Sequence, residues 1–181
     1  EPVVRDLDFS HVRAEHGPKF FVSATNVRTG KIKVFHAMEI TPEALLASAC
    51  LPTVFQTVEI GGEAYWDGGF SGNPALFPLY EPELPDDILV VSINPMRRDD
   101  IPDTPLEIQN RINEISFNAS LLGELRAINF VRRLIAEGRM EAGKMKAVNV
   151  HMISDDRLMN ELSADSKQSP TPWLLERLKE A

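Results

Sequence analysis

The chain has 181 residues, of which 43% are hydrophobic and 25% charged, a balance typical of a globular protein. Its formal net charge of −8 argues against a nucleic-acid partner, because an acidic surface repels phosphates. The arginine pairs at 97–98 and 132–133 are expected on a solvated face. No apolar run approaches the roughly 18 residues that span a membrane, and no signal-peptide pattern is present. A cytoplasmic protein is therefore expected, with a transient contact at a membrane surface left open.

Cysteine and histidine usage argues against a disulfide or a metal site. The single cysteine, Cys50, cannot form an intrachain disulfide or a cysteine-rich zinc site. The four histidines show neither His-x-x-x-His nor His-Glu-x-x-His spacing, which would bind metal from one helix. No metal and no cofactor are expected. Because the sequence opens on Glu1 instead of methionine, we also expect further polypeptide upstream.

The first predicted elements are a β-hairpin and a short helix. Residues 19–25 and 31–35 are rich in β-forming side chains and flank a polar turn, a pattern typical of a hairpin. The Thr-Pro-Glu at 41–43 then supplies an N-cap, a first-turn proline and an acidic residue that suits the helix dipole. We expect a short buried helix that extends to Cys50 and is ended by Pro52.

A second hairpin and a buried strand are predicted next. Residues 58–66 form the hairpin, with its turn at 60–63, and residues 69–80 are loop-like because prolines interrupt them. The nearly continuous apolar run at 87–94 is typical of a strand covered on both faces of a mostly parallel sheet. That run favours an α/β fold over an all-β sandwich.

A long helix is predicted over residues 104–137, followed by a strand at 147–153 and short helices at 157–162 and 173–179. The apolar residues of the long helix recur at mixed intervals of three and four, so we expect them to face the core. An acyl-binding groove or a membrane-facing surface is the alternative for some of them. They are Ile108, Ile112, Ile115, Leu122, Leu125, Phe130 and Leu134.

Asp67 is the strongest candidate for a catalytic residue. It follows the return strand of the second predicted hairpin and precedes Gly68 and Gly69. Because glycine lacks a Cβ, this backbone is expected to turn with positive φ, approach a substrate closely and leave the carboxylate projecting at the strand end. Ligands bind at strand ends in open α/β sheets. The alternative is a plain hairpin turn, in which Asp-Gly is a common dipeptide.

Several motifs resemble the later motif blocks of patatin-like phospholipases. They are residues 47–52 (Ala-Ser-Ala-Cys-Leu-Pro), 52–55 (Pro-Thr-Val-Phe), 65–70 (Tyr-Trp-Asp-Gly-Gly-Phe) and 73–74 (Asn-Pro), in the order and spacing of that family. The resemblance covers roughly residues 20–94. It implies an α/β fold with a three-layer patatin-like core and a mostly parallel sheet, whose N-terminal part is missing from this chain.

The resemblance also implies a division into two domains. Residues 1–100 would be the C-terminal part of a patatin-like acyl hydrolase domain. Residues 101–181 would be a helical C-terminal extension packed on it, because part of this segment is similar to an extension found on a bacterial branch of the family.

In patatin-like phospholipases a Ser-Asp dyad hydrolyses acyl esters, so the resemblance implies that Asp67 is the base and that Gly68 and Gly69 shape its motif. Burial beside Trp66 and Phe70 is expected to raise the pKa of Asp67. The family's serine stands in a Gly-x-Ser-x-Gly motif, which this chain lacks, and the chain also lacks the family's glycine-rich oxyanion loop. The expected partners are a lipid or other acyl-ester substrate and the missing N-terminal part that carries the nucleophile.

The expected function is lipid degradation by a serine-dependent carboxylic ester hydrolase of the phospholipase A or lipase type. The alternatives are a catalytically inactive half-domain that binds a lipid or a protein, and the same fold acting on a polyester or a thioester. Ser48 and Cys50 lie in the short apolar helix, where a hydroxyl bonded to the main chain and a buried thiol are the ordinary roles. His36 could complete a triad, but a lone histidine after a strand is more often a surface or packing residue.

Overall fold

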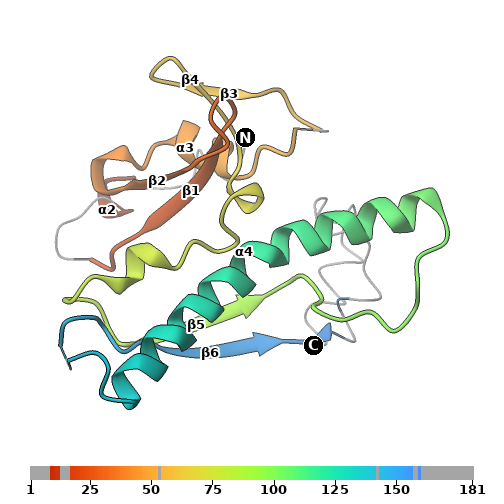
Figure 1. Cartoon of the computed structure of the whole chain (residues 1–181). Coiled ribbons are helices and arrows are strands. Elements are labelled where there is room, and N and C mark those ends of the chain that lie inside the picture. The colour runs from red at the N-terminus through yellow and green to blue at the C-terminus, as the bar shows by residue number, and fades with distance from the viewer. Residues whose placement is uncertain (1–8, 13–16, 53, 142, 157–158, 160–181) are drawn as a thin grey trace. The chain divides into compact units, whose positions relative to one another are not determined.

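The computed structural model describes residues 9–12, 17–52, 54–141, 143–156 and 159. The chain folds into two compact units, Glu1–Pro78 and Leu79–Ala181, each with a sheet of its own (Figure 1). No helix within the described ranges is both long and apolar enough to cross a membrane. The predicted division into residues 1–100 and 101–181 stays a prediction.

The first unit is built on a four-stranded antiparallel sheet in the order β2-β1-β4-β3. Its strands are β1 (Phe21–Asn26), β2 (Ile32–His36), β3 (Val58–Ile60) and β4 (Glu63–Asp67). Both predicted hairpins are confirmed, since β1 pairs with β2 and β3 pairs with β4. This sheet is not the mostly parallel one that was predicted. Short turns join the strands of each hairpin, whereas parallel neighbours need a crossover of about a dozen residues.

A short helix, α3 (Pro42–Ser48), packs on this sheet and helps to form its core. Thr41 Oγ1 accepts the N–H of Ala44 at 3.2 Å, which confirms the predicted N-cap. The helix ends at Ser48, before the predicted end at Cys50, and buries only one side, because Leu46 is exposed. The buried core residues are Val22, Ala24, Phe35, Ile40, Ala44, Ala47 and Tyr65. The remaining short helices are α2 (Phe9–Val12), η1 (Ala37–Glu39), η2 (Gly68–Phe70) and η3 (Phe77–Tyr80).

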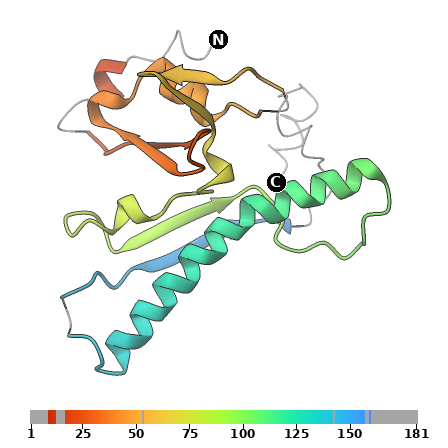
Figure 2. The same ribbon diagram turned by 45° about the horizontal axis from the view of Figure 1, so that its top comes forward.

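The second unit is a β-α-β unit made of β5 (Asp87–Ser92), α4 (Pro105–Ala136) and β6 (Asn149–Ser154). The two strands pair in parallel, and α4 runs across them as the crossover helix in both views (Figures 1 and 2). A capping box of Thr104 and Glu107 begins α4. The predicted long helix and following strand are therefore confirmed. The two further helices predicted after residue 156 lie, Met159 aside, outside the described residues.

One face of the parallel strand pair carries exposed apolar side chains. Ile88 and Val90 of β5 are buried, whereas Leu89 and Val91 are 59% and 64% exposed, because alternate side chains of a strand point to opposite faces. The prediction that this strand is covered on both faces is therefore wrong for the described chain.

The prediction that the apolar residues of α4 face the core is also wrong for most of them. The exposed ones are Ile108, Ile112, Ile115, Leu122 and Phe130. The buried residues of α4 are Glu114, Asn118, Leu121 and Ile128. The buried stripe of the helix thus includes two polar side chains that periodicity did not single out.

A buried carboxylate fastens α4 to the loop before it. Glu114 is 2% exposed, and its Oε2 accepts hydrogen bonds from Arg98 Nε at 2.8 Å and from Arg111 Nη1 at 3.2 Å. Asn118 Nδ2 donates to the carbonyl of Pro95 at 3.0 Å. Arg98 is therefore an internal ion-pair partner, and the prediction that both arginines at 97–98 lie on a solvated face is wrong for this one.

Replacing the buried carboxylate tests this anchor. Glu114→Gln leaves two guanidinium groups without the charge that neutralises them, so we expect the free energy of unfolding to fall by about 3 kcal/mol. Urea denaturation of the 181-residue chain measures it. The control, Glu141→Gln, removes an exposed carboxylate paired with Lys144, and should cost less than about 0.5 kcal/mol. Equal losses in the two variants would contradict the assignment of Glu114.

Candidate functional site

Hydrogen bonds fix Asp67 at the end of β4, where it lies opposite Ala24 of β1. The main-chain N–H of Asp67 donates to the carbonyl of Cys50 at 2.8 Å. Its main-chain carbonyl accepts a hydrogen bond from Thr25 Oγ1 at 2.8 Å, and its carboxylate Oδ1 accepts one from the N–H of Gly69 at 2.7 Å. Both main-chain polar groups and one carboxylate oxygen are therefore engaged, which gives the carboxylate a defined orientation.

The second carboxylate oxygen of Asp67, Oδ2, has an unused capacity to accept a proton. Within the part of the chain that the structure describes, no hydrogen bond reaches this oxygen. The residue is half-buried, and the resulting loss of hydration raises the pKa of Asp67, against the lowering effect of the Gly69 N–H. The direction of the shift is the one predicted. A carboxylate with a raised pKa is the stronger base at neutral pH.

Gly68 is required by a close approach of two chain segments, not by its backbone angle. Gly68 and Gly69 were predicted to have positive φ, but they form the single turn η2 and are not among the glycines with positive φ. The prediction is wrong because the Asp67 carboxylate caps a helical turn, which needs ordinary negative φ. A Cβ at Gly68 would overlap the main-chain carbonyl of Ser23 on β1. The close approach is therefore to a neighbouring strand.

Two hydroxyl groups behind Asp67 were missed by the sequence reasoning. Thr25 Oγ1 donates to the Asp67 carbonyl and lies 2.7 Å from Ser71 Oγ. Thr25 is buried in β1, and Ser71 directly follows the η2 turn. The sequence gives only a weak signal for this pair, the Gly-Phe-Ser-Gly that follows Asp67, because Thr25 is far away in the chain and has the ordinary β-propensity of threonine.

The other candidate residues do not hydrogen-bond to the Asp67 carboxylate in the described chain. Cys50 is buried, its Sγ–H donates to the carbonyl of Gln56 at 3.1 Å, and burial raises the pKa of the thiol. His36 is exposed, with Nε2 3.8 Å from Glu39 Oε2. Ser48 is half-buried at the end of α3.

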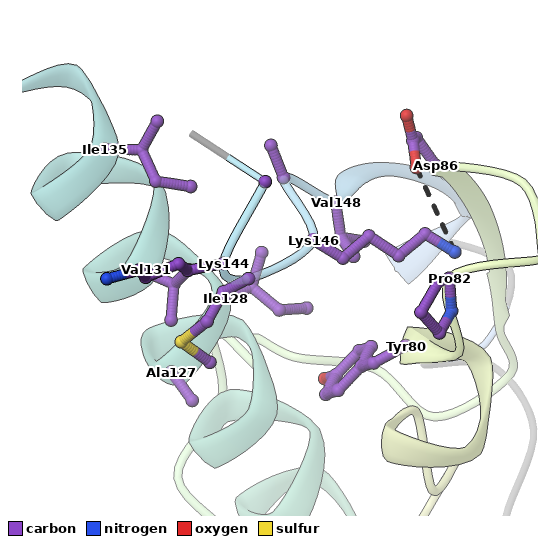
Figure 3. Close-up of a pocket in the computed structure, with 13 residues that line it drawn as sticks. Tyr80, Pro82, Asp86, Ala127, Ile128, Val131, Ile135, Lys144, Lys146 and Val148 are labelled. Atoms are coloured by element: carbon purple, nitrogen blue, oxygen red, sulfur yellow. Dashed lines mark ion pairs between the residues drawn. The ribbon is translucent and has the colours of Figure 1, made fainter. Parts of the chain in front are cut away.

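A cavity of about 570 Å³ lies in the second unit, and residues of that unit alone line it (Figure 3). Apolar side chains of α4 form one wall, and Tyr80 lies on the opposite side. The Lys146 ammonium group is turned toward Asp86, and it donates to three main-chain carbonyls, one in η3 (Leu79) and two in the loop after it (Glu81 and Leu84). Those bonds use all three of its donors. No group of three metal-ligating side chains occurs among the described residues.

A match to a family model shows which known proteins most of the first unit is similar to. Residues 7–80 match the model of the patatin-like phospholipase family. This segment is patatin-like. It contains the antiparallel sheet, Asp67 and the two hydroxyl groups behind it, and it confirms the predicted resemblance. No curated protein matches the chain. The match suggests a relationship to a family of lipid acyl hydrolases, whereas the three-layer core and a missing N-terminal part stay predictions.

A methyl group at position 68 tests the close approach. Gly68→Ala forces the Asp67 turn away from Ser23, so we expect a loss of about 1–3 kcal/mol in the free energy of unfolding, typical of overpacking. The control is Gly123→Ala in α4, where an added Cβ meets no atom within 4 Å and helix propensity should raise stability by up to about 1 kcal/mol. Thermal denaturation followed by circular dichroism compares them. A destabilised Gly123→Ala or a neutral Gly68→Ala would contradict this geometry.

The raised pKa of Asp67 predicts a pH-dependent stability difference. A carboxyl group whose pKa is raised in the folded state weakens folding when it is ionised, and this penalty vanishes below the pKa of the unfolded chain. Asp67→Asn keeps an oxygen for the Gly69 N–H without the charge. We therefore expect the variant to be more stable than the original chain at pH 7. The gain should shrink as the pH falls through the raised pKa toward the ordinary carboxyl value of 3.8. Urea titrations across that range measure it, and a constant difference would argue against a raised pKa.

Proposed function

We propose that this chain carries the base of a patatin-like serine acyl hydrolase, with Asp67 as the base and Gly68 and Gly69 as the residues that shape its motif. The observation that carries the proposal lies inside the patatin-like segment: both main-chain polar groups of Asp67 are held, while no hydrogen bond from the described residues reaches its Oδ2. The proposed substrate is a lipid ester, most naturally a phospholipid. Neither a cofactor nor a metal takes part.

The proposed reaction uses Asp67 twice. A serine hydroxyl is a poor nucleophile unless a base lies within about 2.6–3.2 Å, so Oδ2 takes the hydroxyl proton as the serine oxygen attacks the ester carbonyl. The proton then passes to the departing alcohol, and an acyl-serine remains. Water attacks this acyl group while Asp67 removes its proton, and the fatty acid leaves as the serine recovers its hydrogen. Half-burial supports this role, because a carboxylate in water at its ordinary pKa is a weak base.

The proposal places the nucleophile outside the 181 residues. The chain has no Gly-x-Ser-x-Gly motif, and Ser71, whose flanking residues come nearest to it, is engaged with Thr25. Of the residues that line the cavity of the second unit, Tyr80 alone belongs to the patatin-like segment. We therefore propose that a further segment of the same protein supplies the serine and completes a substrate site around Asp67. In this proposal the residues after 100 are the helical extension of the enzyme.

The test is made in the complete protein that contains this chain. We expect Asp67→Asn to lower ester hydrolysis by roughly a hundredfold to ten-thousandfold, the range that general-base catalysis supplies. Hydrolysis of phospholipid vesicles, a soluble aryl ester and an acyl thioester measures both the loss and the preferred substrate. The control is Asp99→Asn, which removes an equal charge from an exposed residue and should leave activity unchanged.

Labelling by a fluorophosphonate probe locates the nucleophile independently. Such probes react with an activated serine, so the complete protein should be labelled, and the Asp67→Asn variant much more slowly. Peptide mass analysis should place the label outside the 181 residues. Near-normal hydrolysis in Asp67→Asn would refute the assignment of the base. A label on a serine of this chain would refute the placement of the nucleophile, and a complete protein without label or turnover would favour the lipid- or protein-binding alternative.

A further inference from the structure

We infer that Thr25 is a positioning residue for the base, acting through its hydrogen bond to the main-chain carbonyl of Asp67. This inference rests on the proposed function of Asp67. Thr25 does not touch the carboxylate, and its role is to hold the Asp67 main chain so that Oδ2 keeps one direction.

The direction of each hydrogen bond follows from counting protons. Thr25 Oγ1 has one hydrogen, and the Asp67 carbonyl at 2.8 Å can only accept. In the 2.7 Å contact with Ser71, the serine hydroxyl must therefore be the donor. The chain of donors runs from Ser71 to Thr25 to Asp67. The Ser71 N–H in turn donates to the carbonyl of Gly68 at 3.0 Å, so both ends of this chain lie in the turn that carries the base.

The surroundings make the Thr25 hydroxyl a rigid support. Thr25 is 6% exposed and lies on β1, which has β2 on one side and β4 on the other. The same strand meets the turn a second time where Ser23 contacts Gly68. Main-chain ladder bonds hold β1 itself, so they do not require a hydroxyl at position 25. A valine has nearly the same shape and also suits a β-strand, so packing alone does not explain why position 25 carries a hydroxyl.

The position of Asp67 depends on this support because few other bonds hold its main chain. Without the Thr25 hydroxyl, the Asp67 carbonyl loses this partner. Within the described residues, the hydrogen bonds that then fix Asp67 itself are its N–H to the Cys50 carbonyl and the Gly69 N–H to its carboxylate. A displacement of about 1 Å at a reacting group can lower the rate about a hundredfold. Substrate binding involves other groups, so the loss should fall on kcat.

The experiment compares Thr25→Val with Thr25→Ser in the complete protein. We expect Thr25→Val to lower kcat roughly tenfold to a hundredfold with KM nearly unchanged, and Thr25→Ser, which keeps the hydroxyl, to remain within about threefold of the original. Thr25→Ala gives a second variant without the hydroxyl if Thr25→Val does not fold. Circular dichroism melting accompanies each variant.

The pH profile of kcat/KM separates positioning from partial unfolding. Asp67 must be ionised to act, so activity falls on the acid side as its carboxylate becomes protonated. In Thr25→Val a displaced Asp67 is more hydrated, so the acid limb should move to lower pH while the plateau drops. Among the described residues, Cys50 is the titratable group whose charge would interact with that of Asp67. Burial raises the pKa of its thiol, so the thiol stays neutral over the acid pH range of this experiment. Loss of folded protein alone would lower the plateau without moving the limb.

The outcomes distinguish this inference from the proposed function. If Asp67→Asn abolishes turnover while Thr25→Val and Thr25→Ala keep the original kcat and acid limb, the base is right and the positioning role is wrong. If Thr25→Ser is as impaired as Thr25→Val, the hydroxyl is not the cause and the inference also fails. If Asp67→Asn retains activity, the proposed function itself is refuted.

Discussion

The contact between the Asp67 turn and strand β1 is the constraint on which the site depends. Gly68 approaches the Ser23 carbonyl so closely that no side chain fits between them, and Thr25, on the same strand, donates to the Asp67 carbonyl. The strand therefore supports the turn at two points, one steric and one polar. Since β1 lies inside the antiparallel sheet, this support is as rigid as the sheet itself, which lets a short turn present a carboxylate in one orientation.

The second unit leaves apolar surface that a larger domain would bury. Parallel strands occur almost always with both faces covered, yet β5 has a covered face and an exposed one that carries Leu89 and Val91. The long helix α4 also exposes apolar residues along several turns. Further strands and helices of the same protein would cover such faces. This supports the proposal that the protein contains further polypeptide outside the 181 residues.

Local signals in the sequence predicted the elements well, because they act through neighbouring residues. Thr41 caps α3 and Thr104 caps α4. Each cap needs only the threonine side chain and an N–H group of the next few residues. Burial was predicted less well, since periodicity shows that a face is apolar but not whether anything covers it. Glu114 shows the reverse case, a charged residue that is buried. Its pairing with Arg111 is a local i,i+3 contact on α4, but its pairing with Arg98, in the loop before the helix, is one that no local pattern indicates. The Asp67 motif was found from sequence, but its hydroxyl support from Thr25 depends on strand pairing across the fold.

The state of Asp67 bears on the choice between catalysis and simple binding. A half-buried carboxylate with a raised pKa weakens the folded state at neutral pH, and an asparagine could satisfy the Gly69 N–H without that penalty. A module that bound only the acyl chain of a lipid would gain nothing from the charge, because an apolar chain offers an ionised oxygen neither a proton nor a positive charge. A general base, in contrast, must take up a proton and return it. A half-buried carboxylate with a raised pKa, such as that of Asp67, can do so. The raised pKa of Asp67 therefore supports the acid–base role that we propose for it.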